Sequence, residues 1–221
     1  MKKNILVLGL FIFAQTCSYA FNWTSLLTPL VQSQSGTYTK TQAQTNSADI
    51  LKALADFQSQ TQAIDNSVQN SFLSVVSQLS TPQESTILNT KVSSILSNST
   101  QTQEQKNILV NQLISAYTGN LNNNKTDVAD IIRNMSYADK LSLANNMAAL
   151  AQDSRQYLTL AKQGVSTAST LMKASQNASD AIATINAIRQ TATNLKARAT
   201  TVANFVNKVR TISKYAGFFI Q

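Results

Sequence analysis

The sequence predicts an all-α protein: an elongated helical bundle dominated by a long C-terminal antiparallel helical hairpin, with shorter helices forming a cap. Helix-breaking residues are few, with 5 glycines and 2 prolines among 221 residues. Apolar residues recur at spacings of three and four along most of the chain, which is the period of an amphipathic helix. From Tyr137 onward hardly a breaker interrupts this period, so the longest helices are expected there.

Residues 1–20 have the layout of a secretory signal peptide. Lys2 and Lys3 precede an apolar run of about ten residues, and the small residues Ser18 and Ala20 provide a cleavage site. The run is short of the roughly 20 residues that span a bilayer as a helix. We expect cleavage after Ala20 and export to the periplasm, the cell surface or the extracellular space.

Cys17 is the only cysteine of the chain, and it lies within this leader. It leaves open a lipoprotein alternative, in which its thiol is lipidated, although Gln15 and Thr16 fit such processing poorly. Once the leader is removed the chain contains no disulfide, so packing alone must hold the fold. The lysine-led leader and the low cysteine use favour a bacterial origin.

Residues 21–46 combine a short apolar segment with a polar linker rich in Gln, Ser and Thr. The segment is either a tethered arm or a flap folded onto the bundle. The flap is favoured because exposed Phe and Trp side chains are costly in water. Phe21 and Trp23 are therefore candidate contacts with a partner or a membrane. The apolar residues of the segment are Phe21, Trp23, Leu26, Leu27, Leu30 and Val31.

The sequence pattern predicts a helical bundle domain over residues 47–221. This domain begins with an amphipathic helix of about 30 residues. That helix ends near Ser80, where Thr81, Pro82 and Glu84 form the pattern of a capping box for the next helix. The apolar positions of the first helix are Ile50, Leu54, Phe57, Ile64, Val68, Val75 and Leu79.

Three shorter helices are predicted to form the cap. The second of them stops at Gly119, and a loop covers residues 120–126 because clustered Asn side chains compete for backbone hydrogen bonds. Thr126 caps the third, and Ser136 with Asp139 forms a candidate capping box for the helix that follows. The apolar stretches of the three helices cover residues 87–96, 108–117 and 128–132.

The last eighty residues predict two long helices that fold back at Asn177 as an antiparallel hairpin. The first keeps its seam across Gly164, and the second has a heptad seam. One uninterrupted helix is the alternative, and it is disfavoured because an alanine-rich seam needs a partner to bury it. The first seam comprises Ala144, Met147, Ala151, Leu158, Ala161, Val165, Ala168 and Met172. The second comprises Ala178, Ala181, Ile185, Ile188, Ala192, Leu195, Ala199, Val202, Val206 and Val209.

The sequence offers little for catalysis. It has no histidine, and no cysteine after the leader, so common general bases, thiol nucleophiles and zinc ligands are absent. No two glycines after the leader lie near one another, as a phosphate-binding loop would require. Asp127 and Asp130 share a helix face, and their favoured role is charge in a first helical turn. We expect no enzyme, no cofactor and no metal site.

The positive charge lies in the second half of the chain. Residues 21–130 carry five Lys against seven Asp and Glu, whereas residues 131–221 carry eleven Lys and Arg against three Asp. These cations are scattered rather than clustered, which favours a solvated helix face. Aromatic residues are too sparse among them for a nucleic-acid surface, so no nucleic-acid partner is expected.

The C-terminal stretch FVNKVRTISKYAGFFIQ continues the seam to about Ala216. Gly217 is predicted to end the helix, which leaves Phe218, Phe219 and Ile220 as further candidate contacts with a partner or a membrane.

These features favour an exported, non-enzymatic interaction or structural protein of a bacterial envelope, acting as a subunit or accessory factor of a surface or secretion assembly. Its expected partner is an envelope or secretion-assembly protein, or a second copy. The alternative is a membrane-active helical protein of the pore-forming kind, since a basic amphipathic tail can lie on a membrane surface. The absence of a long apolar run after Ala20 disfavours it.

Overall fold

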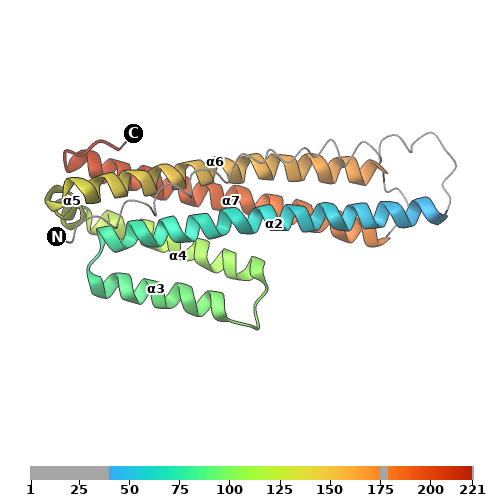
Figure 1. Cartoon of the computed structure of the whole chain (residues 1–221), viewed down its shortest axis with the longest axis horizontal. Helices are drawn as coiled ribbons and strands as arrows, with labels where there is room; N and C mark the ends of the chain where they lie inside the picture. Colours follow the sequence, from blue (N-terminus) through green and yellow to red (C-terminus); the bar gives the residue numbers. More distant parts are fainter. Residues whose placement is uncertain (1–39, 175–178, 221) are drawn as a thin grey trace, which may run out of the picture. The chain divides into compact units, whose positions relative to one another are not determined.

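The computed structural model describes residues 40–174 and 179–220, and it is helical, without strands, over these ranges. Within these ranges, three long helices pack with three shorter ones (Figure 1). The helices are α2 (Lys40–Leu79), α3 (Pro82–Ser97), α4 (Gln103–Asn123), α5 (Lys125–Asn134), α6 (Tyr137–Ala174) and α7 (Ser179–Tyr215). The predicted all-α bundle is confirmed, and α2 begins seven residues before the expected start at Ser47.

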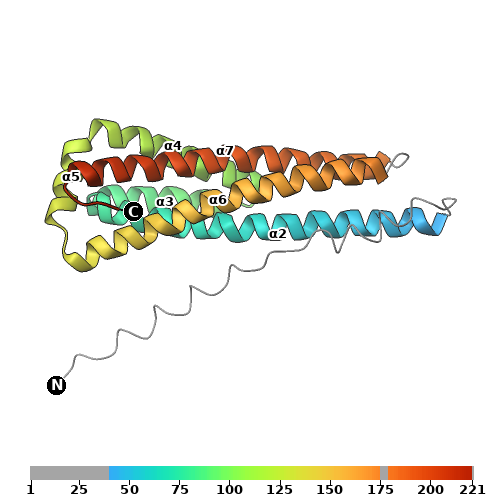
Figure 2. The ribbon, with the colours of Figure 1, turned by 90° about the horizontal axis from the view of Figure 1, so that it is seen from above.

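Helices α6 and α7 form the predicted antiparallel hairpin, and α2 lies beside α6 (Figure 2). Across the hairpin, Ser154 Oγ donates a hydrogen bond of 2.9 Å to the carbonyl of Ala199. The alternative of one uninterrupted helix is therefore wrong. The expected cap at Asn177 lies outside the described residues.

The antiparallel pairing of α2 with α6 is visible in two side-chain contacts. Ser67 Oγ donates to Asp153 at 2.9 Å, and Gln78 Nε2 donates to Ser142 at 3.1 Å. Residue numbers rise along α2 while those of its partners fall along α6, so the two helices run in opposite directions.

The heptad seam of α7 is confirmed. All eight predicted seam residues whose side chains the structure describes, from Ile185 to Val209, are buried. Several of them are small, so α6 and α7 can approach closely. Their exposed fractions are at most 2 %, for Ile185, Ile188, Ala192, Leu195, Ala199, Val202, Val206 and Val209.

The predicted seam of α6 is partly wrong. Leu158 and Val165 are 42 % and 43 % exposed, whereas the residues just before them, Tyr157 and Gly164, are buried. The physical reason is a close approach to α2: a Cβ atom on Gly164 would lie 2.7 Å from Cζ of Phe57, whose side chain is fully buried. Only glycine fits there, so the larger apolar residue next to it points outward.

The short helices begin with capping boxes. As predicted, the Thr81 hydroxyl accepts from the Glu84 amide at 3.3 Å, while the Glu84 carboxylate accepts from the Thr81 amide at 2.9 Å. Thr102 and Gln105 repeat this arrangement at the start of α4.

The end predicted for α4 at Gly119 is wrong, because α4 continues to Asn123 and its last turn is held by Leu121, which is 3 % exposed. The loop expected over residues 120–126 is thereby replaced by helix on both sides of Asn124. Asn124, and not Thr126, precedes α5. The capping role of Ser136 is confirmed, since its hydroxyl accepts from the Asp139 amide at 3.1 Å.

Candidate interaction surface

The first turn of α6 and the last turn of α7 place exposed aromatic and aliphatic side chains at one end of the hairpin. We call Tyr137, Leu141, Tyr215 and Phe219 the aromatic end. Their exposed fractions are 83 %, 51 %, 53 % and 70 %. Several large exposed apolar side chains at one end of a bundle make that end a candidate contact surface, whereas single exposed ones are ordinary.

The C-terminal tail joins the aromatic end because α7 stops at a glycine. Gly217 has φ +81°, and the amide of Phe218 donates at 2.8 Å to the carbonyl of Ser213 while that of Gly217 donates at 3.0 Å to Lys214. This is a Schellman motif, which ends a helix and turns the chain aside. After this motif the tail turns back along the bundle (Figures 1 and 2).

The five residues singled out from the sequence have different positions. Phe219 is exposed, and Phe218 and Ile220 are half-buried. Phe21 and Trp23 lie outside the described residues. Tyr137, Leu141 and Tyr215 were missed because each looks like an ordinary helix residue until the hairpin brings the two helix ends together.

Two cations of α5 hold the ring of Tyr215. Lys125 Nζ lies 4.3 Å from the ring centroid, and Arg133 Cζ lies 5.6 Å from it. Arg133 is also paired with Asp130, and its carbonyl accepts from Lys140 Nζ at 3.1 Å. Cation–π contacts of this kind contribute about 0.5–1 kcal/mol each at exposed sites. The exposed Tyr215 ring is thus held in place, with basic groups around it.

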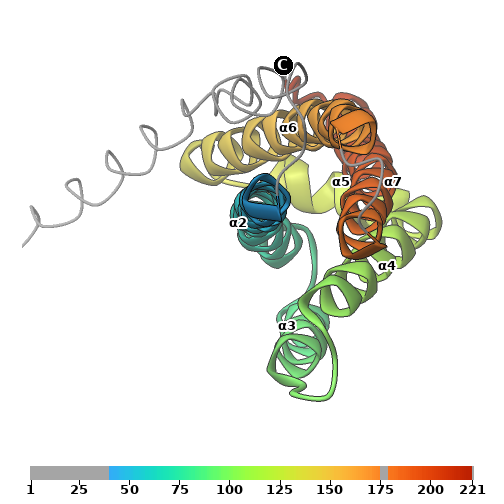
Figure 3. The same cartoon turned by 90° about the vertical axis from the view of Figure 1, so that its right-hand side faces the viewer.

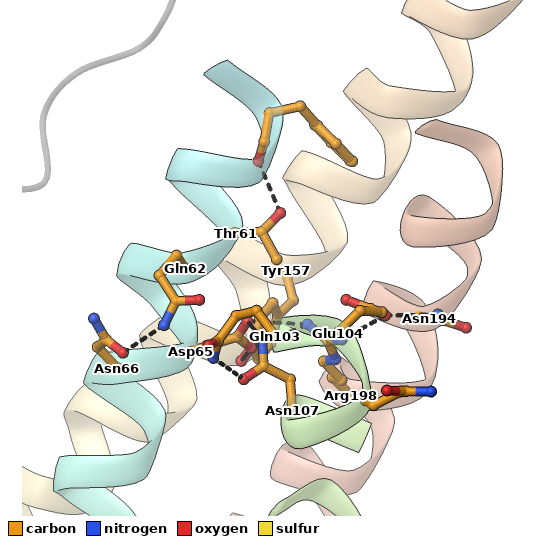
Figure 4. A network of polar contacts seen from close by, with 12 residues as sticks. Thr61, Gln62, Asp65, Asn66, Gln103, Glu104, Asn107, Tyr157, Asn194 and Arg198 are labelled. Atoms are coloured by element: carbon orange, nitrogen blue, oxygen red, sulfur yellow. Dashed lines mark hydrogen bonds and ion pairs between the residues drawn. The ribbon is translucent and has the colours of Figure 1, made fainter. Parts of the chain in front are cut away.

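A group of polar side chains lies in the interior of the bundle. Asp65 of α2 is at the centre of this polar network (Figure 4). Arg198 of α7 donates from Nη1 to both carboxylate oxygens of Asp65, at 3.1 and 3.0 Å. The hydroxyl of Tyr157 in α6 donates to the same carboxylate at 2.6 Å. Asn107 of α4 donates to it as well. Four helices therefore meet at one carboxylate.

Arg198 has a second anionic partner in α4. Its Nη2 lies 2.6 Å from Oε1 of Glu104, which also accepts from Asn194 at 2.6 Å. Asp65 and Arg198 are 3 % and 2 % exposed, so the pair is removed from water. Removing one partner of such a pair leaves a buried charge uncompensated, which makes the network sensitive to single substitutions.

Burial controls the ionisation of the network. Desolvation raises the pKa of Asp65 above its ordinary value, although Arg198 and the Tyr157 hydroxyl oppose the shift. Desolvation, together with the neighbouring charge of Asp65, raises the pKa of Tyr157 well above its ordinary value. The cavity beside these groups measures about 10 Å³, which is the space of about one water molecule.

Asp153 of α6 is a further buried acid, and it faces α2. It is 5 % exposed, and its carboxylate accepts from Ser67. Desolvation raises the pKa of Asp153 to about 6, against a smaller lowering by the Ser67 hydrogen bond.

Within residues 40–174 and 179–220, no group of three or more His, Cys, Asp or Glu side chains could hold a metal ion. None of the helices described there has the length and hydrophobicity needed to cross a membrane.

Comparison with known proteins identifies no relative: no family model, no curated protein and no solved structure matches the chain.

Proposed function

We propose that this chain is an exported, non-enzymatic interaction protein of a bacterial envelope that binds its partner through the aromatic end. The observation that carries the proposal is the exposure of Tyr137, Tyr215 and Phe219 on neighbouring ends of α6 and α7. Tyr, Phe and Arg are enriched in protein interfaces, where a few such anchors provide most of the binding energy. A role as subunit or accessory factor of a surface or secretion assembly fits this arrangement.

The scaffold behind the aromatic end supports a binding role. The Schellman motif fixes where the tail leaves α7, and the cations of α5 hold Tyr215. The aromatic anchors are thus positioned before binding, which lowers the entropy lost when a partner docks. The leader-like sequence of residues 1–20 supports export.

The experiment is a pull-down from the native envelope with the exported chain as bait. Replacing Tyr137 and Phe219 by Ala should reduce affinity for the partner on the order of a thousandfold, because interface anchors commonly contribute about 2 kcal/mol each and every 1.4 kcal/mol is tenfold. The matched control replaces Leu158 and Val165 by Ala, since these residues are also exposed but lie away from the aromatic end. Equal capture by both variants would count against the proposal.

A membrane-active role is the second candidate, favoured by the cations Lys125, Arg133 and Lys140 beside the aromatic side chains. Aromatic rings flanked by cations also suit a lipid headgroup region. Release of dye from liposomes by the exported chain at low concentration, lost in the Tyr137 and Phe219 variant, would favour this role. Liposomes that retain their dye, together with specific capture of an envelope protein, would favour the role as an interaction protein.

A further inference from the structure

One side of the α6–α7 hairpin carries exposed apolar and basic side chains together. Helix α6 packs mainly against α7 and α2. Viewed along the bundle, α2 and α3 lie on the same side of α6, so they leave its other side uncovered (Figure 3). We call the exposed residues on that side the hairpin face, which comprises Arg155, Leu158, Lys162 and Val165 of α6 with Arg189 and Lys196 of α7.

The hydrogen bonds of α6 show which way its part of the hairpin face points. Asp153 accepts a hydrogen bond from α2, and Ser154 donates one to the carbonyl of Ala199 in α7. At about 100° per residue, Leu158 lies about 40° beyond Ser154 and about 140° from Asp153. Leu158, and Val165 seven residues later, therefore border α7 on the edge remote from α2.

The same rotation places two cations of α7 beside that edge. A Cβ atom on Gly164 of α6 would lie 3.2 Å from Ala192 Cβ, so Ala192 faces α6, whereas the side chain of Arg198 reaches α2. Arg189 and Lys196 lie about 60° and 40° round α7 from Ala192, and Arg198 lies about 120° round it in the opposite direction. The cations of α7 thus lie next to the exposed apolar residues of α6.

The residues of the hairpin face keep a spacing of seven. An apolar stripe with this period, flanked by charged side chains, is the surface that a coiled-coil helix presents to a further helix. The two exposed apolar residues are about 10 Å apart at 1.5 Å per residue, so a partner helix of a few turns would cover both. The pairs with this spacing are Arg155 with Lys162, Leu158 with Val165, and Arg189 with Lys196.

The charge of the hairpin face is positive and uncompensated. Residues 154–221 carry nine Lys and Arg against one acid, Asp180. Among the side chains that the structure describes, the ion pairs are made by Arg133 and Arg198, so no cation of the hairpin face is paired in this way. Two copies joined through this face would bring cation against cation, which is unfavourable. The charge is complementary to an acidic partner instead.

The shape of the apolar stripe distinguishes a helix from a membrane as that partner. A helix that lies on a membrane surface buries a broad apolar face, commonly with aromatic side chains. The stripe of the hairpin face is narrow, and its two apolar residues, Leu158 and Val165, are aliphatic and only 42 % and 43 % exposed. A narrow stripe between two rows of cations fits one amphipathic helix with acidic flanks.

We propose that the hairpin face binds an acidic amphipathic helix of a partner protein. Apolar residues of that helix pack beside Leu158 and Val165, and its Asp and Glu side chains pair with the cations on both flanks. The contact is separate from the aromatic end and takes a different partner. Replacement of Leu158 and Val165 therefore remains a control for the partner that is captured through the aromatic end.

A designed peptide tests the proposal. The probe is a labelled helical peptide of about three heptads, with Leu along one stripe and Glu at the flanking positions. The control peptide has Lys in place of each Glu. Fluorescence anisotropy with the exported chain should show binding of the acidic peptide and not of the basic one. The affinity should fall as salt is added, because salt screens exposed charges.

Two charge-matched variants locate the contact. Arg189→Glu combined with Lys196→Glu should weaken binding of the acidic peptide on the order of tenfold or more, because like charges then face each other across the interface. The control combines Lys52→Glu with Lys91→Glu, which changes the net charge equally at exposed positions of α2 and α3, and should bind as the parent does. All four positions are exposed, so circular dichroism should show unchanged helical content in both variants.

Three results would overturn the proposal. Equal weakening by the two variants would show attraction to the net charge of the protein rather than to the hairpin face. Binding to phosphatidylglycerol vesicles without binding to the peptide would show a membrane surface as the partner, and binding to neither would show that the face is simply solvated. The Tyr137 and Phe219 variant should bind the peptide like the parent, so failure of this contact is distinguishable from failure of the aromatic end.

Discussion

Asp65 and Arg198 are 133 positions apart in the sequence, yet they form a doubly hydrogen-bonded ion pair inside the bundle. Arg198→Ala should lower the free energy of unfolding by about 3–5 kcal/mol, because Asp65 and Glu104 lose their shared counter-charge. Urea denaturation measures this change. Arg189→Ala, at an exposed position of the same helix, is the control and should cost less than about 1 kcal/mol. Equal decreases in the free energy of unfolding for the two variants would mean that the Asp65–Arg198 ion pair does not stabilise the bundle.

Gly164→Ala should destabilise the protein, although alanine is the better helix former. The added Cβ would meet the ring of Phe57 at 2.7 Å and Ala192 Cβ at 3.2 Å, a degree of overpacking that costs about 1–3 kcal/mol. Gly119→Ala is the matched control, because nothing lies within 4 Å of its added Cβ. It should stabilise α4 by about 0.5–1 kcal/mol. Thermal unfolding of both variants measures the sign of each change in stability. A stabilising Gly164→Ala would show that α6 and α2 lie farther apart than described.

Asp153 should make the protein more stable at mildly acidic pH. The folded state raises its pKa from 3.8 to about 6, so folding favours the protonated acid. The stabilising contribution is present below the unfolded pKa and is lost as the pH rises through about 6. Between pH 7.5 and pH 5 the free energy of unfolding should increase by about 1 kcal/mol from this group.

Asp153→Asn separates this effect from the raised pKa of Asp65, which acts in the same direction. The amide cannot titrate and still hydrogen-bonds Ser67, so the variant should be more stable than the parent at pH 7.5 and depend less on pH. Urea midpoints at both pH values provide the comparison. A variant with the same pH dependence as the parent would assign the effect to other groups.

Deletion of residues 218–221 should leave the helical content nearly unchanged. Phe218 and Ile220 are only half-buried and Phe219 is exposed, so the deletion removes little core. The circular dichroism spectrum should therefore be retained while capture of the envelope partner decreases. Unfolding of the truncated chain would instead show that the tail is part of the core.

Much of the fold follows from the sequence, and the failures have physical causes. The seam of α7 was predicted correctly because its apolar residues keep one heptad phase over the described length. The seam of α6 was misplaced where Gly164 and Tyr157, rather than the apolar Val165 and Leu158, face the interior. Helix α4 continues past Gly119 because Leu121 packs in the core, and tertiary packing overrides local propensity.

The polar network was not predicted, and of the aromatic end only Phe219 was singled out from the sequence. A signal for the network was present, since Asp65 lies beside Ile64 within the seam of a predicted helix, and a charge at such a position implies a buried partner. Nothing in the local sequence identifies that partner as Arg198, because long-range pairing depends on how the helices fold back. The same limit applies to Tyr137 and Tyr215.

Helix α7 packs against α2, α4, α5 and α6, and it follows all of them in the chain. Until α7 docks, Asp65 and Glu104 lack the guanidinium of Arg198. The polar network of four helices therefore closes only once α7 is in place.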